Sequence, residues 1–191
     1  FFAFTRRYFW QLFSALLFVV VVVLLLNTFL GSGIAKLPTL RFPINLSLTR
    51  PLVGGASTVA VSPDGRNIIY LALEDGTPQL FLRPIDQFTS RLIPGTDFAS
   101  DPFFSPDGEW IAFFASGKLK KVGVRGGAAQ NICEIPGFMR GGWWLQDNSI
   151  LFGHINSAIF RVSANGGAPV EVTSLDSVNG EISHRFPQIL P

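Results

Sequence analysis

The hydrophobic pattern divides the chain near residue 30. No charged residue occurs between Arg7 and Lys36, and positions 12–26 are almost all Leu, Phe or Val. About 20 residues at roughly 1.5 Å rise per residue cross a hydrocarbon core of about 30 Å. The aromatic residues 8–10 follow two arginines, as in an interfacial anchor. The pattern predicts one transmembrane helix over residues 8–30, in contact with a lipid bilayer.

Two other interpretations of this segment stay open. A secretory signal peptide has an apolar region of about 7–15 residues and a small-residue cleavage site, and Gly33-Ile34-Ala35 would supply that site. A buried helix of a soluble protein is the other interpretation. The apolar stretch is longer than a signal peptide needs, and the first residue is Phe rather than Met, so we expect further residues upstream. Residues 1–7 are then a truncated cytoplasmic flank.

The pattern changes after the apolar segment. Residues 31–57 are rich in Gly, Pro, Ser and Thr, which is typical of a linker, with a first strand expected at 41–48. From Thr58 onward, short apolar runs alternate with turn signals about every ten residues, which indicates strands. No stretch beyond that point has sustained helical spacing. The sequence therefore predicts an all-β domain over residues 58–191.

An internal repeat orders these strands. Val61-Ser62-Pro63-Asp64-Gly65 recurs 43 residues later as Phe104-Ser105-Pro106-Asp107-Gly108, and Leu145-Gln146-Asp147-Asn148 is a degenerate third copy. After each copy we expect a second strand, a third strand, a tight turn and a fourth strand. The second strands are 68–72, 110–114 and 150–153, the third 79–85, 118–124 and 158–164, and the fourth 129–133 and 169–173. Arg83, Lys121 and Arg161 are expected at matching places in the third strands.

The repeated motif has the chemistry of a turn. Pro fixes φ near −65°, Asp bonds to the nearby backbone, and Gly accepts a positive φ. Four strands in about 40–45 residues make one blade of a β-propeller. The residues given this structural role are Ser62, Pro63, Asp64, Gly65, Ser105, Pro106, Asp107, Gly108 and Asp147.

The predicted fold class is therefore all-β, a partial β-propeller of about three four-stranded blades preceded by one transmembrane helix. Propellers typically close with about four to eight blades. We expect the domain over 58–191 to be incomplete at its C-terminus, because residues 187–191 resemble the start of a fourth repeat. Leu190-Pro191 would stand where Ser105-Pro106 stands.

Charge excludes one class of partner. The net charge is +2, but residues 1–63 contain five basic and no acidic residues, whereas residues 64–191 contain ten basic and thirteen acidic ones. The β domain is therefore mildly acidic, and we expect no basic face for nucleic acid. Only 15% of the residues are charged, against roughly 25% in soluble domains, which agrees with a membrane segment.

No catalytic residue, cofactor or metal site is expected. Cys133 lies in a predicted strand, and a lone cysteine is usually a small buried hydrophobe. His154 and His184 lack clustered carboxylates, so they make a poor metal site. No Gly-x-Ser-x-Gly elbow activates a serine. Trp143-Trp144 is expected to pack in the core, and the basic residues of 118–125 to form a solvated face.

The repeats resemble those of TolB-type β-propellers over about residues 58–191. A longer order of motifs resembles the sensor region of bacterial eukaryotic-like serine/threonine protein kinases. Those motifs are Leu82–Asp86, Ile93–Thr96, Asp101–Gly108, Gly117–Val122 and Ser183–Gln188. The third repeat departs from the pattern at Gln146-Asp147-Asn148, where Pro and Gly are lost.

The resemblance implies a single-pass protein of the inner membrane, with a kinase domain upstream and the propeller on the periplasmic or extracellular side. No kinase motif occurs in this chain, so the chain itself is expected not to be an enzyme. The implied function is a membrane-anchored sensor or interaction module, whose protein or small-molecule partner is unknown. Two alternatives remain: a substrate-gating propeller of a prolyl-oligopeptidase-like peptidase, and the sensor domain of a membrane-bound transcriptional regulator.

Overall fold

The structure, a computed structural model, describes residues 2–30, 51–53, 57–135 and 137–189, with side chains of the helix from Phe9 to Leu24. The chain divides into two units, Phe1–Pro43 and Ile44–Pro191, and each is described by itself. The strand predicted at 41–48 lies outside the described residues, and so does Leu190-Pro191.

The first unit contains one helix, α1 (Phe2–Leu30). Its large apolar side chains are exposed, for example Leu12 at 71% and Phe18 at 70%. The helix predicted over residues 8–30 is confirmed. Its crossing of a membrane is not confirmed, because no helix among the described residues is long and apolar enough to span a bilayer.

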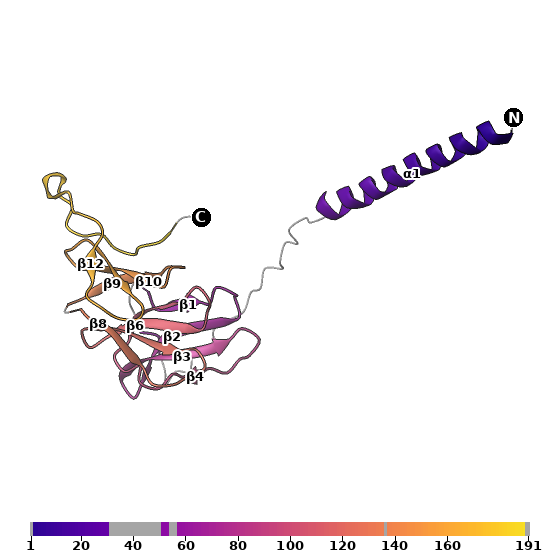
Figure 1. Cartoon of the computed structure of the whole chain (residues 1–191). Coiled ribbons are helices and arrows are strands. Elements are labelled where there is room, and N and C mark those ends of the chain that lie inside the picture. Colours follow the sequence, from indigo (N-terminus) through magenta and orange to yellow (C-terminus); the bar gives the residue numbers. More distant parts are fainter. Residues whose placement is uncertain (1, 31–50, 54–56, 136, 190–191) are drawn as a thin grey trace. The chain divides into compact units, whose positions relative to one another are not determined.

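The second unit contains three four-stranded antiparallel sheets, each with its strands in chain order (Figure 1). Three sheets of four strands agree with the blades predicted from the repeats. A short 3₁₀ helix (Ser177–Asn179) follows the last strand. The strands are β1 (Val59–Val61), β2 (Asn67–Glu74), β3 (Thr77–Pro84), β4 (Arg91–Leu92), β5 (Ser100–Phe104), β6 (Trp110–Ala115), β7 (Lys118–Gly123), β8 (Gln130–Glu134), β9 (Met139–Trp144), β10 (Ser149–His154), β11 (Ile159–Ser163) and β12 (Val170–Glu171).

The second strands form the centre of the core. Residues 68–72 of β2 and 111–115 of β6 are buried without alternation. One apolar cluster lies between the first and second sheets, around Ile69 and Phe113. Another lies between the second and third sheets, around Phe114 and Phe152. The continuous apolar runs therefore arise because neighbouring sheets cover both faces of a blade.

The expected match of Arg83 with Lys121 and Arg161 is wrong by one residue. Positions in the three third strands can be compared through their partners in the second strands. In each sheet, the third-strand residue that pairs with the first buried isoleucine of the second strand is taken as the equivalent position. The pairs at this place are Arg83–Ile68, Val122–Ile111 and Val162–Ile150. Lys121 and Arg161 are each one residue earlier. A shift of one residue moves a strand side chain to the other face, so Arg83 is buried on the face of its sheet that carries Tyr70 and Phe81.

The first strands lie next to one another. Each of β1, β5 and β9 is the terminal strand of its sheet, and contacts join β1 to β5 and β5 to β9. Residues 184–186 continue this series, since the Phe186 N–H donates to the carbonyl of Arg140 at 2.9 Å. We call β1, β5 and β9 the innermost strands. They bring together residues about 40 positions apart in sequence.

Candidate functional site

The two complete Ser-Pro-Asp-Gly turns have nearly the same hydrogen bonds. The hydroxyls of Ser62 and Ser105 donate to Asp64 and Asp107 at 2.6 and 2.5 Å. Each hydroxyl also accepts a backbone N–H from the start of the next strand, at 2.8 Å from Asn67 and 2.9 Å from Trp110. The carboxylates accept the backbone N–H two residues on, both at 3.0 Å.

The third turn reaches a similar geometry with other residues. It is one residue shorter, because the Leu145 N–H donates to the carbonyl of Ser149. Asn148 takes the left-handed conformation, at φ 61°, in place of the repeat glycine. Ser149 donates its hydroxyl to Asp147 at 2.6 Å, and Arg161 Nε donates to that same hydroxyl at 2.8 Å. The serine has moved from before the aspartate to after it.

The turn aspartates are held ionised. Hydrogen bonds from a serine hydroxyl, and then from a backbone N–H, lower the pKa of Asp64, Asp107 and Asp147 below the usual range. Each carboxylate is engaged within its own turn, and that of Asp147 also pairs with Arg161 of β11. No group of three or more metal-ligating side chains occurs among the described residues.

A groove lies along the innermost strands. It has a volume of about 690 Å³, within the range of about 300–1,000 Å³ typical of ligand sites. Its walls come from β1, β5, β9 and residues 186–189. The lining residues are Ser57, Val59, Ala60, Val61, Pro63, Asp101, Pro102, Phe103, Phe104, Pro106, Gly141, Gly142, Trp143, Trp144, Leu145, Gln146, Phe186, Pro187, Gln188 and Ile189.

Two glycines of β9 let aromatic rings that line this groove approach the strand closely. A Cβ added at Gly141 would lie 2.6 Å from Cδ1 of Phe186, and one added at Gly142 would clash with the ring of Phe103. Gly141 also has a φ of +75°, which L side chains rarely adopt. The two glycines therefore permit a close approach between neighbouring innermost strands.

The two tryptophans differ in environment. Trp144 is buried and its Nε1–H donates to Asn148 Oδ1 at 3.2 Å, so core packing holds for this residue. Trp143 is 40% exposed and lines the groove, so the core packing expected for this residue is wrong. Alternation along β9 is the signal that would have separated the two faces.

Asp101 is the one ionisable residue among the described residues that line the groove. It has a left-handed φ of 44°. Burial raises the pKa of Asp101, against the opposing attraction of Arg140 and bonds from Ser100 and the Gly141 backbone. The sequence did not predict Asp101 as a site residue, because Asp101 precedes the turn motif and does not belong to the repeated pattern.

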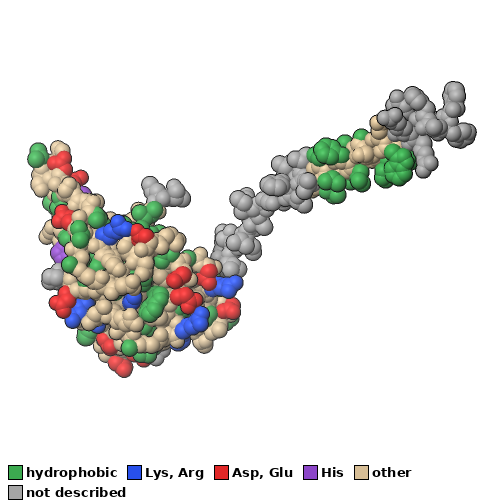
Figure 2. Space-filling view, in the orientation of Figure 1, with side chains coloured by type: hydrophobic (Ala, Val, Ile, Leu, Met, Phe, Trp, Pro, Cys, Tyr) green, Lys and Arg blue, Asp and Glu red, His purple; other side chains and the backbone are tan. Residues whose placement is uncertain are grey.

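Cys133, His154 and the basic residues of 118–125 lie outside the groove. Burial raises the pKa of Cys133 to about 11, which makes it an unreactive thiol. His154 packs against Gly137. In the basic cluster, Lys118 pairs with Glu134 at 3.2 Å, and Lys121 lies 4.9 Å from the Trp110 ring. Basic and acidic side chains are interspersed over the visible face of the β unit (Figure 2).

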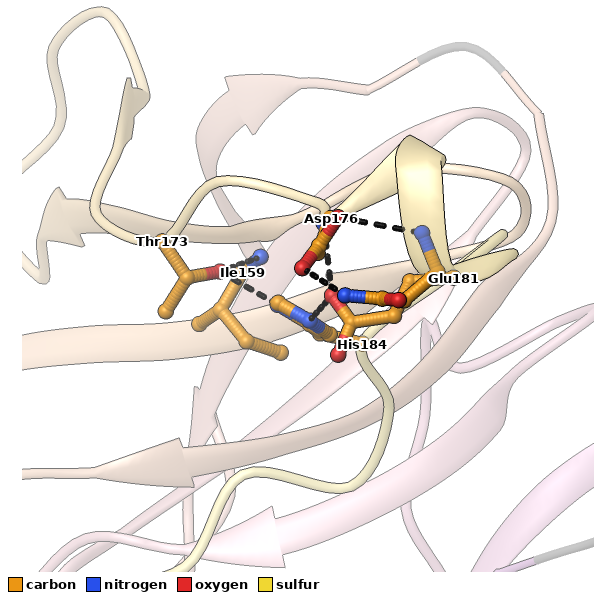
Figure 3. A network of polar contacts seen from close by, with 6 residues as sticks. Ile159, Thr173, Asp176, Glu181 and His184 are labelled. Atoms are coloured by element: carbon orange, nitrogen blue, oxygen red, sulfur yellow. Dashed lines mark hydrogen bonds and ion pairs between the residues drawn. The ribbon is translucent and has the colours of Figure 1, made fainter.

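His184 belongs to a polar network between the third sheet and the last segment (Figure 3). Its Nδ1 lies 2.8 Å from the Thr173 hydroxyl, which also accepts the Ile159 N–H. Its Nε2 lies 3.2 Å from Glu181, whose carboxylate accepts the Asp176 N–H at 2.7 Å. The network fixes the connection between β12 and residues 184–186.

No protein family and no curated protein matches the sequence. Solved structures do match. A putative TolB from Agrobacterium tumefaciens has a TM-score of 0.52 at 19% identity over 67% of this chain and 50% of that one. TolB from Acinetobacter baumannii has a TM-score of 0.56 at 22% identity over 67% of this chain and 33% of that one.

A third match, from a nidogen–laminin complex, has a TM-score of 0.51 at 11% identity over 59% of this chain and 46% of that one. The chain therefore spans half or less of the length of each of these structures. Identities this low show the fold alone. On these likenesses and its three four-stranded sheets, the Ile44–Pro191 unit has the fold of a TolB-type β-propeller.

Proposed function

We propose that this chain is a non-catalytic interaction module whose groove along β1, β5 and β9 holds part of a protein partner. The observation that carries the proposal is the groove itself. It is concave, mostly apolar and built on strand backbones from three separate sheets. Sites of that kind are the usual places for ligands. The propeller fold does not choose among functions, so the proposal rests on this site.

The apolar side chains of the groove support binding rather than chemistry. Val61, Trp143, Phe186 and Ile189 are between 40% and 55% exposed, and all four line the groove. Exposed apolar patches of this kind mark interaction surfaces. Asp101 is the one ionisable side chain among the described lining residues, so the groove offers no acid–base pair, which favours recognition over catalysis.

The proposal extends to the first unit. We place residues 8–30 in a lipid bilayer as a tether, with the propeller on the extracytoplasmic side. The support is the absence of charge between Arg7 and Lys36 and the adjacent aromatic residues. A sensor role for a serine/threonine protein kinase is the finer form of this proposal, and it rests on the order of the sequence motifs.

Site-specific photo-crosslinking in cells tests the interaction site. A benzoylphenylalanine at position 143 should capture a discrete protein adduct. The same group at position 88 is the control, because Phe88 is 85% exposed and does not line the groove. An adduct at position 143 and none at position 88 supports the proposal. Equal capture at both positions, or none at position 143, contradicts it.

A further inference from the structure

We infer that the groove selects an extended peptide segment of its partner that carries a lysine or arginine between apolar residues, with Asp101 as the residue that recognises the cation. This inference rests on the proposed function and adds the chemistry of the partner. It combines three observations: a single carboxylate, an aromatic lining and unpaired strand edges.

Charge complementarity indicates that the ligand carries a positive charge. Asp101 is the one ionisable side chain among the described lining residues. Asp101 is half-buried, and withdrawing a carboxylate from water is costly unless a counter-charge is supplied. Arg140 approaches from a second cavity of about 390 Å³, which Asp101 also lines. Since burial still outweighs the attraction of Arg140 in the pKa of Asp101, the carboxylate would gain from a further cation.

The aromatic lining also favours a positively charged ligand. Trp143 is 40% exposed at the groove, and Phe103 and Phe186 also line it. An ammonium or guanidinium over an aromatic face is attracted by the negative face of the ring, most strongly with Trp. The flanking valines and prolines suit the apolar neighbours of the cation. An anionic ligand would find no basic partner among the described lining residues.

The strand edges indicate a peptide rather than a small amine. The strands β1, β5 and β9 each pair with a neighbour in their sheet on one side only. Unpaired edges accept an added extended segment through main-chain hydrogen bonds. The edge at Arg140 already accepts one, from the Phe186 N–H at 2.9 Å. A peptide backbone could add to a free edge in the same way.

The test uses the full chain in neutral phosphatidylcholine nanodiscs, with empty nanodiscs as blank. The probe is fluorescein-labelled acetyl-Ala-Val-Phe-Lys-Phe-Val-Ala-amide, followed by fluorescence anisotropy. Two matched peptides replace the lysine by norleucine or by glutamate. We expect the lysine peptide to bind at least about 10-fold more tightly than the other two.

Asp101→Asn is the central variant, because asparagine tolerates the left-handed conformation and keeps a side-chain oxygen. It should remove the preference for lysine and leave the norleucine peptide unchanged. Asp86→Asn is the matched control, an exposed aspartate outside the groove. The three peptides on the unmutated chain test the charge preference even if Asp101→Asn does not fold.

The outcomes separate the two proposals. If all three peptides bind equally and Trp143→Ala weakens all of them, the charge selection is overturned and the groove remains the interaction site. If no peptide binds, or Trp143→Ala has no effect on binding, the assignment of the groove is overturned as well. A lysine preference that persists in Asp101→Asn assigns recognition to another residue and overturns the role of Asp101.

Discussion

The ring of Phe186 packs on Gly141 so closely that a Cβ at position 141 would stand 2.6 Å from its Cδ1 and 3.1 Å from its Cα. The same glycine has a φ of +75°. The two residues join β9 to the segment 184–186, and both line the groove. This contact therefore links the stability of the fold to the shape of the candidate site.

Gly141→Ala should destabilise the second unit by about 2–4 kcal/mol, since left-handed strain and overpacking each cost about 1–3 kcal/mol. Urea unfolding of the full chain in mild detergent measures the change. Gly76→Ala is the matched control, because its φ is +80° and nothing lies within 4 Å of the added Cβ.

Phe186→Ala should relieve part of the clash in the double variant with Gly141→Ala. The coupling free energy of this cycle should then be about 1 kcal/mol or more, as for residues in contact. Equal effects of Gly141→Ala and Gly76→Ala, with no coupling to position 186, would show that only the backbone conformation matters.

The Asp107 turn should make stability depend on pH. The Ser105 hydroxyl and then the Glu109 N–H lower the pKa of Asp107 below its ordinary value of 3.8. A lowered folded-state pKa stabilises the fold above the unfolded value, and this gain is lost as pH falls through the folded value. Because Asp107 is exposed, solvent screens much of this effect. Asp107→Asn should therefore lower the free energy of unfolding modestly at neutral pH and less in acid.

Urea unfolding of both chains at neutral pH and at a pH below 3.8 measures whether the effect of Asp107→Asn becomes smaller in acid. Asp86→Asn serves as the control, because Asp86 is exposed and lies outside the repeated turns. A cost for Asp107→Asn that stays constant between the two pH values would mean that the carboxylate charge does not stabilise the turn.

Cys133 should react slowly while the protein is folded. Burial raises the pKa of its thiol from 9.0 to about 11, and the thiolate is the reactive form. A higher pKa leaves less thiolate at neutral pH, and the sulfur is buried. Labelling with a disulfide reagent should therefore be at least about 10-fold slower in the folded chain than in urea. Similar rates in both conditions would place the sulfur at the surface.

The proposed tether predicts that the full chain stays in the membrane pellet after alkaline carbonate. The double variant Val20→Asp and Val21→Asp should move it to the supernatant, because aspartate at the centre of a span costs about 2.5–3.5 kcal/mol per residue. Val170→Asp with Val172→Asp is the control, since both valines are exposed in the second unit. Recovery of the unmutated chain in the supernatant would refute the tether.

The sequence by itself determined the elements that depend on local chemistry. The apolar run predicted the helix α1. The Ser-Pro-Asp-Gly copies predicted the strand pairs on either side of each turn, because proline, aspartate and glycine restrict the same few dihedral angles wherever they occur. Even the degenerate copy at Asp147 kept its place, since Asn148 also tolerates a positive φ.

The tertiary structure decided which face each side chain occupies and what it meets. Arg83 and Lys121 were expected at matching places in the third strands, but Arg83 lies on the other face of its sheet, because register is set by pairing across strands. Asp101, Gly141 and Phe186 form one site although up to 85 positions separate them. Their contacts come from packing between sheets, which no local pattern encodes, so only the fold could bring the carboxylate, the glycine and the ring together.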